Sequence, residues 1–434
     1  MSSKKRAIEI PIPRRRVLRG SLAGLATVFL SPALKGCDDG MAPLDGSVDG
    51  GTADTGVVGD PDSGTGSPFP PREMPAPPAL RSLIADIGPL GDPDANDIRL
   101  PEGFSSRVVA RSGELVEGTD YEWHTAPDGG ATFATMDGGW IYVSNSEIPL
   151  AGGVGAIRFD ASGTITAAYR ILDRTDINCA GGPTPWGTWL SCEELEAGQV
   201  YETDPWGERD PVLRPALGTF KHEAVTVDPV NGQLYLSEDA SGGGFYRFTP
   251  AGMNEYDYPD LSEGLLEIAE VAPGGAVTWH EVPDPLREGS VSTRNQVAES
   301  TGFDGGEGIW HHDGVVYMST KGDDRVWAYD VAGESMSVLY DDDDFTPVPL
   351  SGVDNITVSC CGDVLVAEDG GSMQVVAILP SGEPKPLLQI VGQDSSEITG
   401  PAFDPSGTRL YFSSQRGGSG GITYEVTGPF HEEV

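Results

Sequence analysis

One pattern recurs six times after residue 99: a turn of small residues, an apolar or aromatic strand, and then Ser or Ala followed by polar residues. The copies are GGWIYVSNSE (138–147), WGTWLSCEE (186–194), NGQLYLSED (231–239), DGVVYMSTKGD (313–323), CGDVLVAEDG (361–370) and SGTRLYFSSQRG (406–417). The steps between copies are 47, 46, 82, 48 and 46 residues, counted between Tyr142, Trp189, Tyr235, Tyr317, Leu365 and Tyr411. A period in the mid-forties with several short strands per unit is typical of a β-propeller blade. The sequence therefore predicts an all-β fold, a six-bladed β-propeller over residues 99–434.

Two features of this pattern concern the ring as a whole. The step of 82 residues is one period plus an insertion, which we place within residues 240–300. The segments FSSRVVAR (104–111) and ITYEV (422–426) are strand-like, and one of them is expected to complete a blade and close the ring.

The N-terminus has the features of an export signal. Seven Lys and Arg residues within 4–19 precede an apolar run at 21–34 that is too short to span a bilayer. The segment PRRRVLR (13–19) resembles the motif read by the twin-arginine export machinery, which carries folded proteins. The segment LKGC (34–37) resembles a lipobox, in which Cys37 is the lipidation site; ordinary cleavage nearby with a free Cys37 is the alternative. We expect residues 1–36 to be a signal peptide and the protein to be exported to the periplasm or cell envelope, touching a membrane only through this lipid.

Charge and composition narrow the remaining possibilities. With 27 Lys and Arg against 67 Asp and Glu, the formal net charge is −40, which excludes a nucleic-acid partner that would be held through its phosphates. Residues 37–98 are rich in Gly, Asp, Ser, Thr and Pro, a composition that is typical of a disordered linker.

In a propeller blade, the residues before the first strand and after the second strand meet at one mouth of the central channel. The first set is Asn178, Cys179, His222, Glu223, Glu307, Asp354, Asn355 and Thr399. The second set is Asn145, Glu147, Glu193, Glu194, Glu238, Asp239, Lys321, Glu368, Asp369 and Arg416. Converging carboxylates cannot all stay ionised unless cations neutralise them. Oxygen-rich ligand sets favour Ca²⁺, and the thiol of Cys179 adds a site for iron or zinc. The alternative is that each acid caps a turn of its own blade.

The same region carries a family resemblance. The segments concerned are LPEGF (100–104), NCAGGPTPWGTWLSCEE (178–194), FKHEAVTVDP (220–229), YLSEDASGGGFYRF (235–248), FDGGEGIW (303–310), VDNITVS (353–359) and VAEDGG (366–371). They resemble the PhoX-type alkaline phosphatases, which are secreted six-bladed propellers.

The resemblance implies an iron and calcium cluster at the channel mouth that binds a phosphate ester substrate and hydrolyses phosphate monoesters. Carried over by motif, the iron ligands and catalytic residues are Cys179, Glu194, Glu223 and Glu307. The calcium ligands implied in the same way are Asn145, Glu147, Glu193, Asp354 and Glu368.

This sequence departs from the family pattern at one place. The family has an Arg that grips phosphate shortly before the residue corresponding to Glu307, whereas this chain has Asp304, Gly305 and Gly306 there. We expect Lys321 or Arg416 to bind the phosphate instead, since each follows the second strand of its blade.

Two other functions remain open at this point. A calcium-dependent lactonase-like propeller hydrolase would place one Ca²⁺ on the axis, but it needs no cysteine such as Cys179. A non-catalytic binding module of the cell envelope would use the acids only as caps.

The paired cysteines Cys360 and Cys361 are expected to lie in a strand with one side chain buried, a vicinal disulfide being the alternative.

Overall fold

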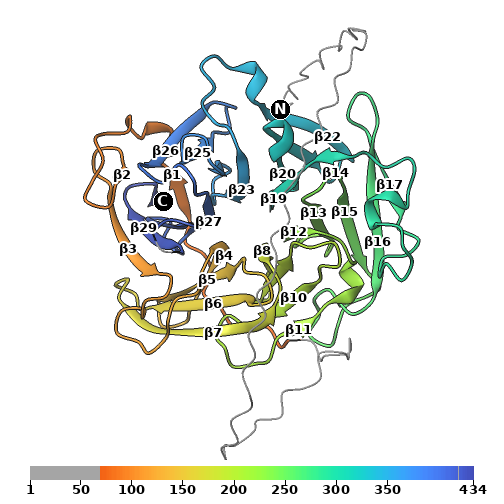
Figure 1. Ribbon diagram of the computed structural model, residues 1–434, viewed down its shortest axis with the longest axis horizontal. Coiled ribbons are helices and arrows are strands. Elements are labelled where there is room, and N and C mark those ends of the chain that lie inside the picture. Colours follow the sequence, from red (N-terminus) through yellow and green to blue (C-terminus); the bar gives the residue numbers. More distant parts are fainter. Residues whose placement is uncertain (1–68, 419) are drawn as a thin grey trace, which may run out of the picture. The chain divides into compact units, whose positions relative to one another are not determined.

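The computed structural model describes residues 69–418 and 420–434, which form six antiparallel sheets arranged around a central axis (Figure 1). The predicted six-bladed β-propeller is confirmed. The predicted signal peptide (1–36), the lipidation site Cys37 and the first part of the predicted linker lie outside the described residues. Within those residues, no helix is long and apolar enough to span a membrane.

The first three blades follow the chain from the innermost strand outward. Blade 1 consists of β4 (Pro127–Ala134), β5 (Trp140–Ser146), β6 (Gly152–Phe159) and β7 (Ile165–Thr175). Blade 2 consists of β8 (Asn178–Pro183), β9 (Trp189–Glu193), β10 (Val200–Thr203) and β11 (Val212–Leu213). Blade 3 has five strands, β12 (His222–Val227), β13 (Leu234–Glu238), β15 (Phe245–Pro250), β16 (Gly264–Val271) and β17 (Val277–Glu281).

The last three blades repeat the plan. Blade 4 consists of β19 (Gly306–His312), β20 (Val315–Thr320), β21 (Arg325–Asp330) and β22 (Ser335–Asp341). Blade 5 consists of β23 (Val353–Val358), β24 (Val364–Glu368), β25 (Gln374–Ile378), β26 (Pro384–Ile390) and the added β2 (Ile98–Arg99). Blade 6 consists of β27 (Ile398–Phe403), β28 (Arg409–Ser414), β29 (Ile422–Thr427) and β3 (Ser105–Arg111).

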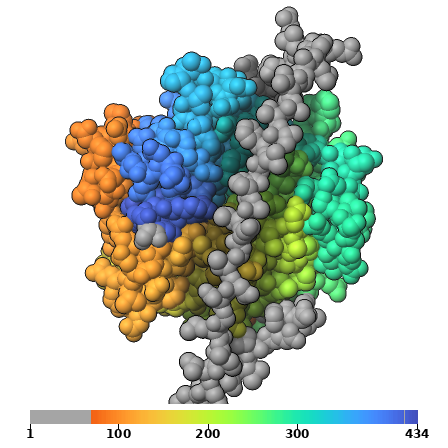
Figure 2. All heavy atoms as spheres, viewed as in Figure 1, coloured from red at the N-terminus to blue at the C-terminus, as the bar shows by residue number. Residues whose placement is uncertain are grey.

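Blade 6 closes the ring with strands from both ends of the propeller. The N-terminal β3 pairs antiparallel with β29, so that Arg111 lies opposite Ile422. In the space-filling view the orange residues near 100 accordingly lie against the blue C-terminal ones (Figure 2). Both segments named from the sequence as candidates for ring closure therefore take part in it.

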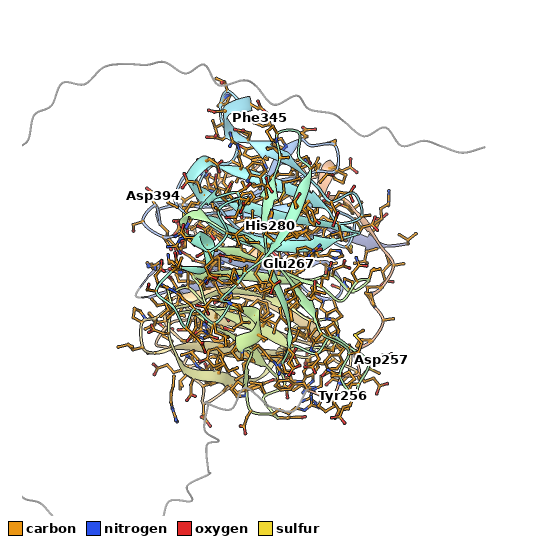
Figure 3. All side chains as sticks on the ribbon, turned by 90° about the vertical axis from the view of Figure 1, so that its right-hand side faces the viewer. Tyr256, Asp257, Glu267, His280, Phe345 and Asp394 are labelled. Atoms are coloured by element: carbon orange, nitrogen blue, oxygen red, sulfur yellow. The ribbon has the colours of Figure 1, made fainter. Side chains whose placement is uncertain are left out.

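The predicted insertion within 240–300 belongs to blade 3. It supplies the fifth strand β17 and a return segment that contains the short 3-10 helix η3 (Thr293–Asn295). A small two-stranded sheet joins β14 (Ser241–Gly243) to β18 (Phe303–Asp304) where the insertion begins and ends. Figure 3 looks onto this outer side of the propeller and labels Glu267 on β16 and His280 on β17.

Large side chains of the repeats fill the space between neighbouring blades. Tyr142, Trp189, Tyr235 and Tyr411 are all buried. The rings of Tyr142 and Tyr411 stack across the junction of blades 1 and 6 with their centroids 5.2 Å apart. Stacked aromatic pairs of this kind stabilise a core by roughly 0.5–1.5 kcal/mol beyond the area they bury.

The prediction that residues 37–98 form a disordered linker is wrong for residues 69–98. Strand β1 (Leu80–Ser82) pairs with the C-terminal β30 (His431–Glu433), and Ile84 and Ile98 are fully buried in the apolar core of blades 5 and 6. Arg72 forms an ion pair with Asp204 of blade 2. The average composition of 37–98 is polar, but its second half contains enough apolar residues to order that part against the ring.

Candidate metal centre

The innermost strands β4, β8, β12, β19, β23 and β27 surround the axis (Figure 1), and all six share one irregularity. In each of them the first residue pairs with the last residue of the second strand of the same blade. A β-bulge then interrupts the pairing, directly after the first residue in five of the strands and after the second residue in β27. Bulges bend a strand and redirect its side chains. The second residue of each innermost strand therefore occupies an equivalent place in every blade; these residues are Asp128, Cys179, Glu223, Glu307, Asp354 and Thr399.

A second ring of equivalent positions directly follows the second strand of each blade. These residues are Glu147, Glu194, Asp239, Lys321, Asp369 and Gln415. The two rings lie at the same end of the blades, because the innermost strand starts where the second strand ends.

Side chains from both rings line a cavity of about 210 Å³ at this end of the channel. The lining residues are Asp128, Glu147, Cys179, Glu194, Glu223, Asp239, Glu307, Lys321, Asp354, Asp369, Glu397, Gln415 and Arg416. Among the described residues that line it, nine are carboxylates and two are cations. The cavity therefore gathers far more acidic than basic groups.

Close packing of the innermost strands narrows the channel beyond this cavity. A Cβ atom added to Gly308 would lie 2.3 Å from the backbone nitrogen of Ile356, and one added to Gly129 would lie 2.5 Å from the Cα of Ala180. Only glycine allows strands to approach so closely. The acidic cavity consequently has a floor made of neighbouring backbones.

The deepest carboxylates are held in their neutral form when no cation accompanies them. Burial, followed by repulsion from Glu307, holds the pKa of Glu223 well above its usual range, and burial followed by Glu147 does the same for Asp128. Burial raises the pKa of Glu194 to about 7 and that of Glu397 to about 8. These shifts express the cost of charging several close carboxylates away from water.

Cys179 lies among these acids. Its Sγ is 3.4 Å from Oε1 of Glu223 and 3.7 Å from Oδ2 of Asp128. Burial, and then the neighbouring Asp128, raise the pKa of the thiol well above its usual value. A thiolate is stable in such surroundings only beside a cation.

The potential ligand atoms of the cavity form four groups, and within each group these atoms lie no more than 4.8 Å apart. The groups are Glu147–Cys179–Glu194, Asp128–Glu147–Glu397, Glu223–Glu307–Asp354 and Asp354–Asp369–Glu397. Neighbouring groups share Glu147, Glu397 or Asp354, so most of the cavity wall is one connected ligand set. One group contains sulfur and the other three contain only oxygen.

This donor set fits the metals that the family resemblance implies. Oε2 of Glu223 is buried and has no hydrogen-bond partner, as expected of an oxygen whose partner is a cation. Oxygen-only groups suit Ca²⁺, and a group with a thiolate suits iron. The predicted iron set is divided, because Cys179 groups with Glu194 whereas Glu223 and Glu307 group with Asp354.

Both predicted phosphate-binding cations lie in the cavity wall. Nζ of Lys321 is 3.1 Å from Glu307, 3.3 Å from Asp354 and 3.1 Å from Asp369. Arg416 pairs with Glu147 at 2.9 Å and also with Glu397. A third cation that sequence reasoning missed, Lys221, lies 2.9 Å from Glu194.

The structure corrects the prediction that Asn145 is a calcium ligand. Its Nδ2 donates to the backbone oxygens of Cys179 and Ala180 at 3.1 and 2.7 Å. Its Oδ1 accepts hydrogen bonds from Trp189 and Ser191 at 2.9 and 3.0 Å. Asn145 thus uses its hydrogen-bonding capacity to hold blade 1 against blade 2.

Glu193 and Glu368, the other two predicted calcium ligands outside the cavity, cap turns of their own blades. Glu193 accepts hydrogen bonds from the backbone nitrogens of Asp176 and Gln199. Glu368 accepts three, from Ser351, Ser372 and Gln374. They are the last residues of β9 and β24 and do not line the cavity, so their hydrogen bonds agree with the capping alternative.

Five residues that line the cavity were missing from the predicted ligand set: Asp128, Asp239, Asp369, Glu397 and Gln415. Asp239 and Asp369 occupy the position directly after a second strand, which is the same position as Glu194. The sequence placed both at the channel mouth, and choosing the ligand at that position in every copy of the repeat would have selected them. Glu397, which precedes β27 and lies outside both rings, had no such signal.

Comparisons with known proteins bear on the family resemblance and on the fold. The family model of alkaline phosphatase PhoX matches residues 144–339. The structure of Pseudomonas fluorescens PhoX in complex with vanadate, a transition state analogue, superposes with a TM-score of 0.64 and 16% identity, covering 81% of this chain and 98% of that one. At this identity the superposition shows a shared fold.

Two further solved structures are less similar. A structural genomics protein of unknown function from Bacteroides thetaiotaomicron has a TM-score of 0.48 at 10% identity, covering 75% of this chain and 76% of that one. The calcium-binding protein regucalcin from Agrobacterium tumefaciens has a TM-score of 0.43 at 14% identity, covering 76% and 97%. No curated protein matches the sequence. The predicted resemblance is thus confirmed: this chain is similar to the PhoX-type alkaline phosphatases in sequence over residues 144–339, and it shares the fold of Pseudomonas fluorescens PhoX over the propeller.

Proposed function

We propose that this protein is an exported, metal-dependent phosphatase that hydrolyses phosphate monoesters in the acidic cavity of the propeller. The observation that carries the proposal is the cavity itself, where nine carboxylates and one thiol converge around two cations. The match to the PhoX family over residues 144–339 supports phosphatase chemistry in particular.

The ligand groups divide the metals by chemistry. Cys179 with Glu147 and Glu194 would hold iron, and the oxygen-only groups around Asp354 and Glu397 would hold calcium. When bound, such cations neutralise the negative charge that builds up on a transferring phosphoryl group.

Lys321 is the residue we assign to the phosphate-binding role of the Arg that this chain lacks. Its backbone nitrogen donates to the oxygen of Gly305 at 2.9 Å, so Lys321 lies directly beside the stretch where the family has that Arg. Its ammonium group lies 3.1 Å from Glu307, at the cavity wall. A lysine from the neighbouring strand end can therefore present a positive charge to the same part of the site.

Arg416 is the second group assigned to phosphate. Its guanidinium group reaches over Glu147 and Glu397 at the cavity wall, and its side chain is about half exposed (54%). This exposure suits a group that meets an incoming anion, because a guanidinium can bind two phosphate oxygens at once.

The lactonase-like alternative explains the cavity less well. That chemistry needs one axial Ca²⁺ and no sulfur, whereas Cys179 lies in the cavity wall within hydrogen-bonding distance of Glu223. Export by the twin-arginine route and a lipid on Cys37 complete the proposal and rest on the sequence of residues 1–37.

Phosphate release from p-nitrophenyl phosphate by the full chain tests the function. We expect activity that is lost on chelation and restored by iron and calcium together. Cys179→Ser should lower activity at least about 100-fold, the scale of losing one strong electrostatic contact to the transition state. The matched control, Cys360→Ser, changes a cysteine outside the cavity and should retain activity. Metal binding without any turnover of phosphate monoesters would contradict the proposed reaction.

A further inference from the structure

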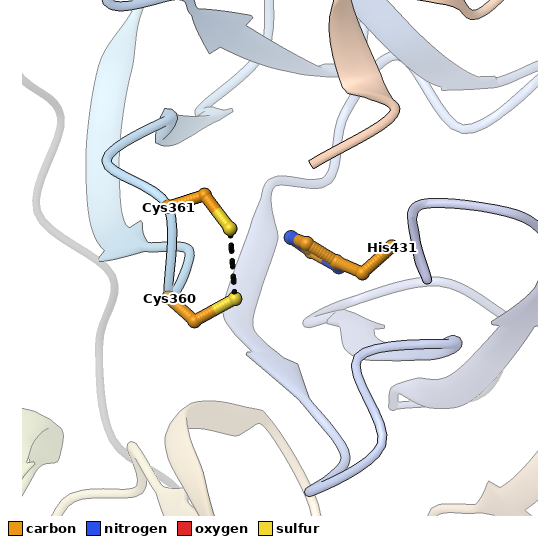
Figure 4. A group of neighbouring side chains, drawn as sticks. All are labelled: Cys360, Cys361 and His431. Atoms are coloured by element: carbon orange, nitrogen blue, oxygen red, sulfur yellow. Dashed lines mark hydrogen bonds between the residues drawn. The ribbon is translucent and has the colours of Figure 1, made fainter. Parts of the chain in front are cut away.

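One further group of side chains that could hold a metal ion lies outside the acidic cavity. Cys360 and Cys361 lie in the turn that joins β23 to β24, rather than in a strand as the sequence suggested. This turn is at the other end of the two strands from Asp354 and Asp369, so the cysteines lie on the opposite face of the propeller. His431, the first residue of β30, meets them there (Figure 4).

The three side chains lie close enough to share one ion. The sulfur atoms of Cys360 and Cys361 are 3.2 Å apart, and the two sulfurs and a ring nitrogen of His431 all lie within 4.8 Å of one another. Around a zinc ion, with bonds of about 2.3 Å to sulfur and about 2.0 Å to nitrogen, ligand atoms lie within about 4 Å of each other. A small inward movement would therefore complete the site.

The hydrogen bonds of His431 prepare its other nitrogen for a ligand role. Nδ1 lies 2.7 Å from the backbone oxygen of Gly407. A carbonyl oxygen only accepts, so Nδ1 carries the proton and Nε2 carries a lone pair. This is the arrangement that orients histidine ligands in metal sites.

Nε2 of His431 has no partner of its own. It is buried without a hydrogen bond, in a residue that is 3% exposed. The edge-on ring of Phe403, 4.9 Å away, helps to fix the imidazole in place. Figure 4 shows the ring pointing toward the two sulfurs, so a buried unsatisfied acceptor faces a pair of thiols.

We propose that Cys360, Cys361 and His431 bind one zinc ion, with a water molecule in the fourth position. Two sulfurs and an imidazole, with no carboxylate in the group, favour zinc over the calcium expected in the cavity. Cys360 is exposed, which leaves room for a water ligand and a path by which the ion enters.

The ion would connect parts of the chain that are distant in sequence. The turn of blade 5 supplies both thiols, β30 supplies the imidazole, and β30 pairs with β1. Cys361 Sγ also lies 3.4 Å from the backbone oxygen of Leu80 on β1. Zinc would thus fasten the paired terminal strands β1 and β30 to blade 5, independently of any reaction in the cavity.

Cobalt titration of the reduced full-length protein tests the site, because thiolate ligands give Co²⁺ an intense charge-transfer absorption. The titration is made in a Cys179→Ser background, which removes the thiol of the cavity. We expect an absorption band that zinc displaces. Adding Cys361→Ser should abolish the band, and adding His431→Gln should weaken cobalt binding at least tenfold.

One matched control and one further ligand variant accompany this titration. His280→Gln changes a histidine on the outer strand β17 (Figure 3), where it bonds Glu270 at 2.8 Å, and should leave the band unchanged. Cys360→Ser removes a proposed ligand at an exposed position and should weaken cobalt binding as well, so it tests the site even where His431→Gln impairs folding. Zinc should raise the melting temperature of the Cys179→Ser protein but not that of the Cys361→Ser variant. A band that persists in Cys361→Ser, or no band although both thiols are shown to be reduced, would overturn the proposal.

Discussion

Glu193 and Glu194 are neighbours in sequence, yet they belong to two different regions of the molecule. Glu193 is the last residue of β9 and accepts hydrogen bonds from two backbone nitrogens of its own blade. Glu194 is the next residue and lines the acidic cavity. The same division separates Glu368, a cap, from Asp369, a cavity residue.

The difference shows which buried carboxylates in this fold are stabilised by backbone hydrogen bonds and which are not. Burial raises the pKa of Glu193, and the backbone donors around this carboxylate offset part of that rise. Burial and then neighbouring acids raise the pKa of Glu223 and of Glu307 in the cavity, and for Glu307 Lys321 offsets part of that rise. The capping acids therefore stabilise the propeller as they stand, whereas the cavity acids do so only beside cations.

The largest expected effect comes from removing one carboxylate at a time from the adjacent residues Glu193 and Glu194. Glu194→Gln should lower phosphatase activity at least about 100-fold and reduce bound iron, because it removes a ligand of the sulfur-containing group. Glu193→Gln should keep both the phosphatase activity and the bound iron of each folded molecule. Steady-state kinetics and metal analysis of the two variants check this, and equal losses would remove the distinction between caps and cavity.

Metal removal should reverse the pH dependence of stability. A carboxyl group whose pKa is raised on folding contributes full stability below the unfolded value of about 4.5, and that stability is lost as pH rises toward the folded pKa. For Glu194 and Glu397 the folded values are about 7 and about 8. The metal-free protein should therefore lose on the order of 3 kcal/mol or more between pH 5 and about pH 8.

With cations bound, the ligands must be ionised, so higher pH should stabilise the loaded protein instead. Urea unfolding at pH 5 and pH 8, before and after chelation, measures both slopes. Identical slopes for the two forms would show that the cavity acids do not hold metal.

Removing a cap should cost stability without touching the cavity. Glu368→Ala leaves three backbone nitrogens without their acceptor, which should lower the free energy of unfolding by about 2 kcal/mol. The matched variant Asp369→Asn should lower it less and should reduce calcium binding. A urea midpoint that is unchanged in Glu368→Ala would contradict the capping role.

The smallest effects are expected at the phosphate-binding cations. Lys321→Ala should weaken competitive inhibition by inorganic phosphate about tenfold, the equivalent of 1.4 kcal/mol. Arg416→Ala should weaken it less, because its side chain is more exposed, 54% against 35% for Lys321. Inhibition constants for phosphate compare the two variants. An unchanged constant in Lys321→Ala would contradict the assignment of Lys321 to the phosphate-binding role of the missing Arg.

The repeat period predicted the architecture well, for a physical reason. Four of the six blades bury a large aromatic side chain at an equivalent position, so Tyr142, Trp189, Tyr235 and Tyr411 mark these blades directly in the sequence. The same spacing brought most of the cavity residues into view, including Cys179, Glu223 and Lys321.

The errors arose where one residue changes the direction of a side chain. Successive residues of a strand point to opposite faces, so an uncertainty of one position exchanges Glu193 with Glu194. The bulges that redirect the innermost strands have no clear signal in the sequence. The ordered structure of residues 69–98 was not predicted, because the composition was averaged over a longer and mostly polar stretch. That average hid apolar side chains such as Ile84 and Ile98, which are fully buried.

Iron and calcium analysis of the protein by plasma mass spectrometry, made side by side for the wild type, Glu194→Gln and Glu193→Gln, tests the central claim most directly. We predict iron together with calcium in the wild type, loss of iron in Glu194→Gln, and full metal content in Glu193→Gln. A wild-type protein with neither metal, or an iron content that is the same in all three, would contradict the assignment of this cavity as a metal centre.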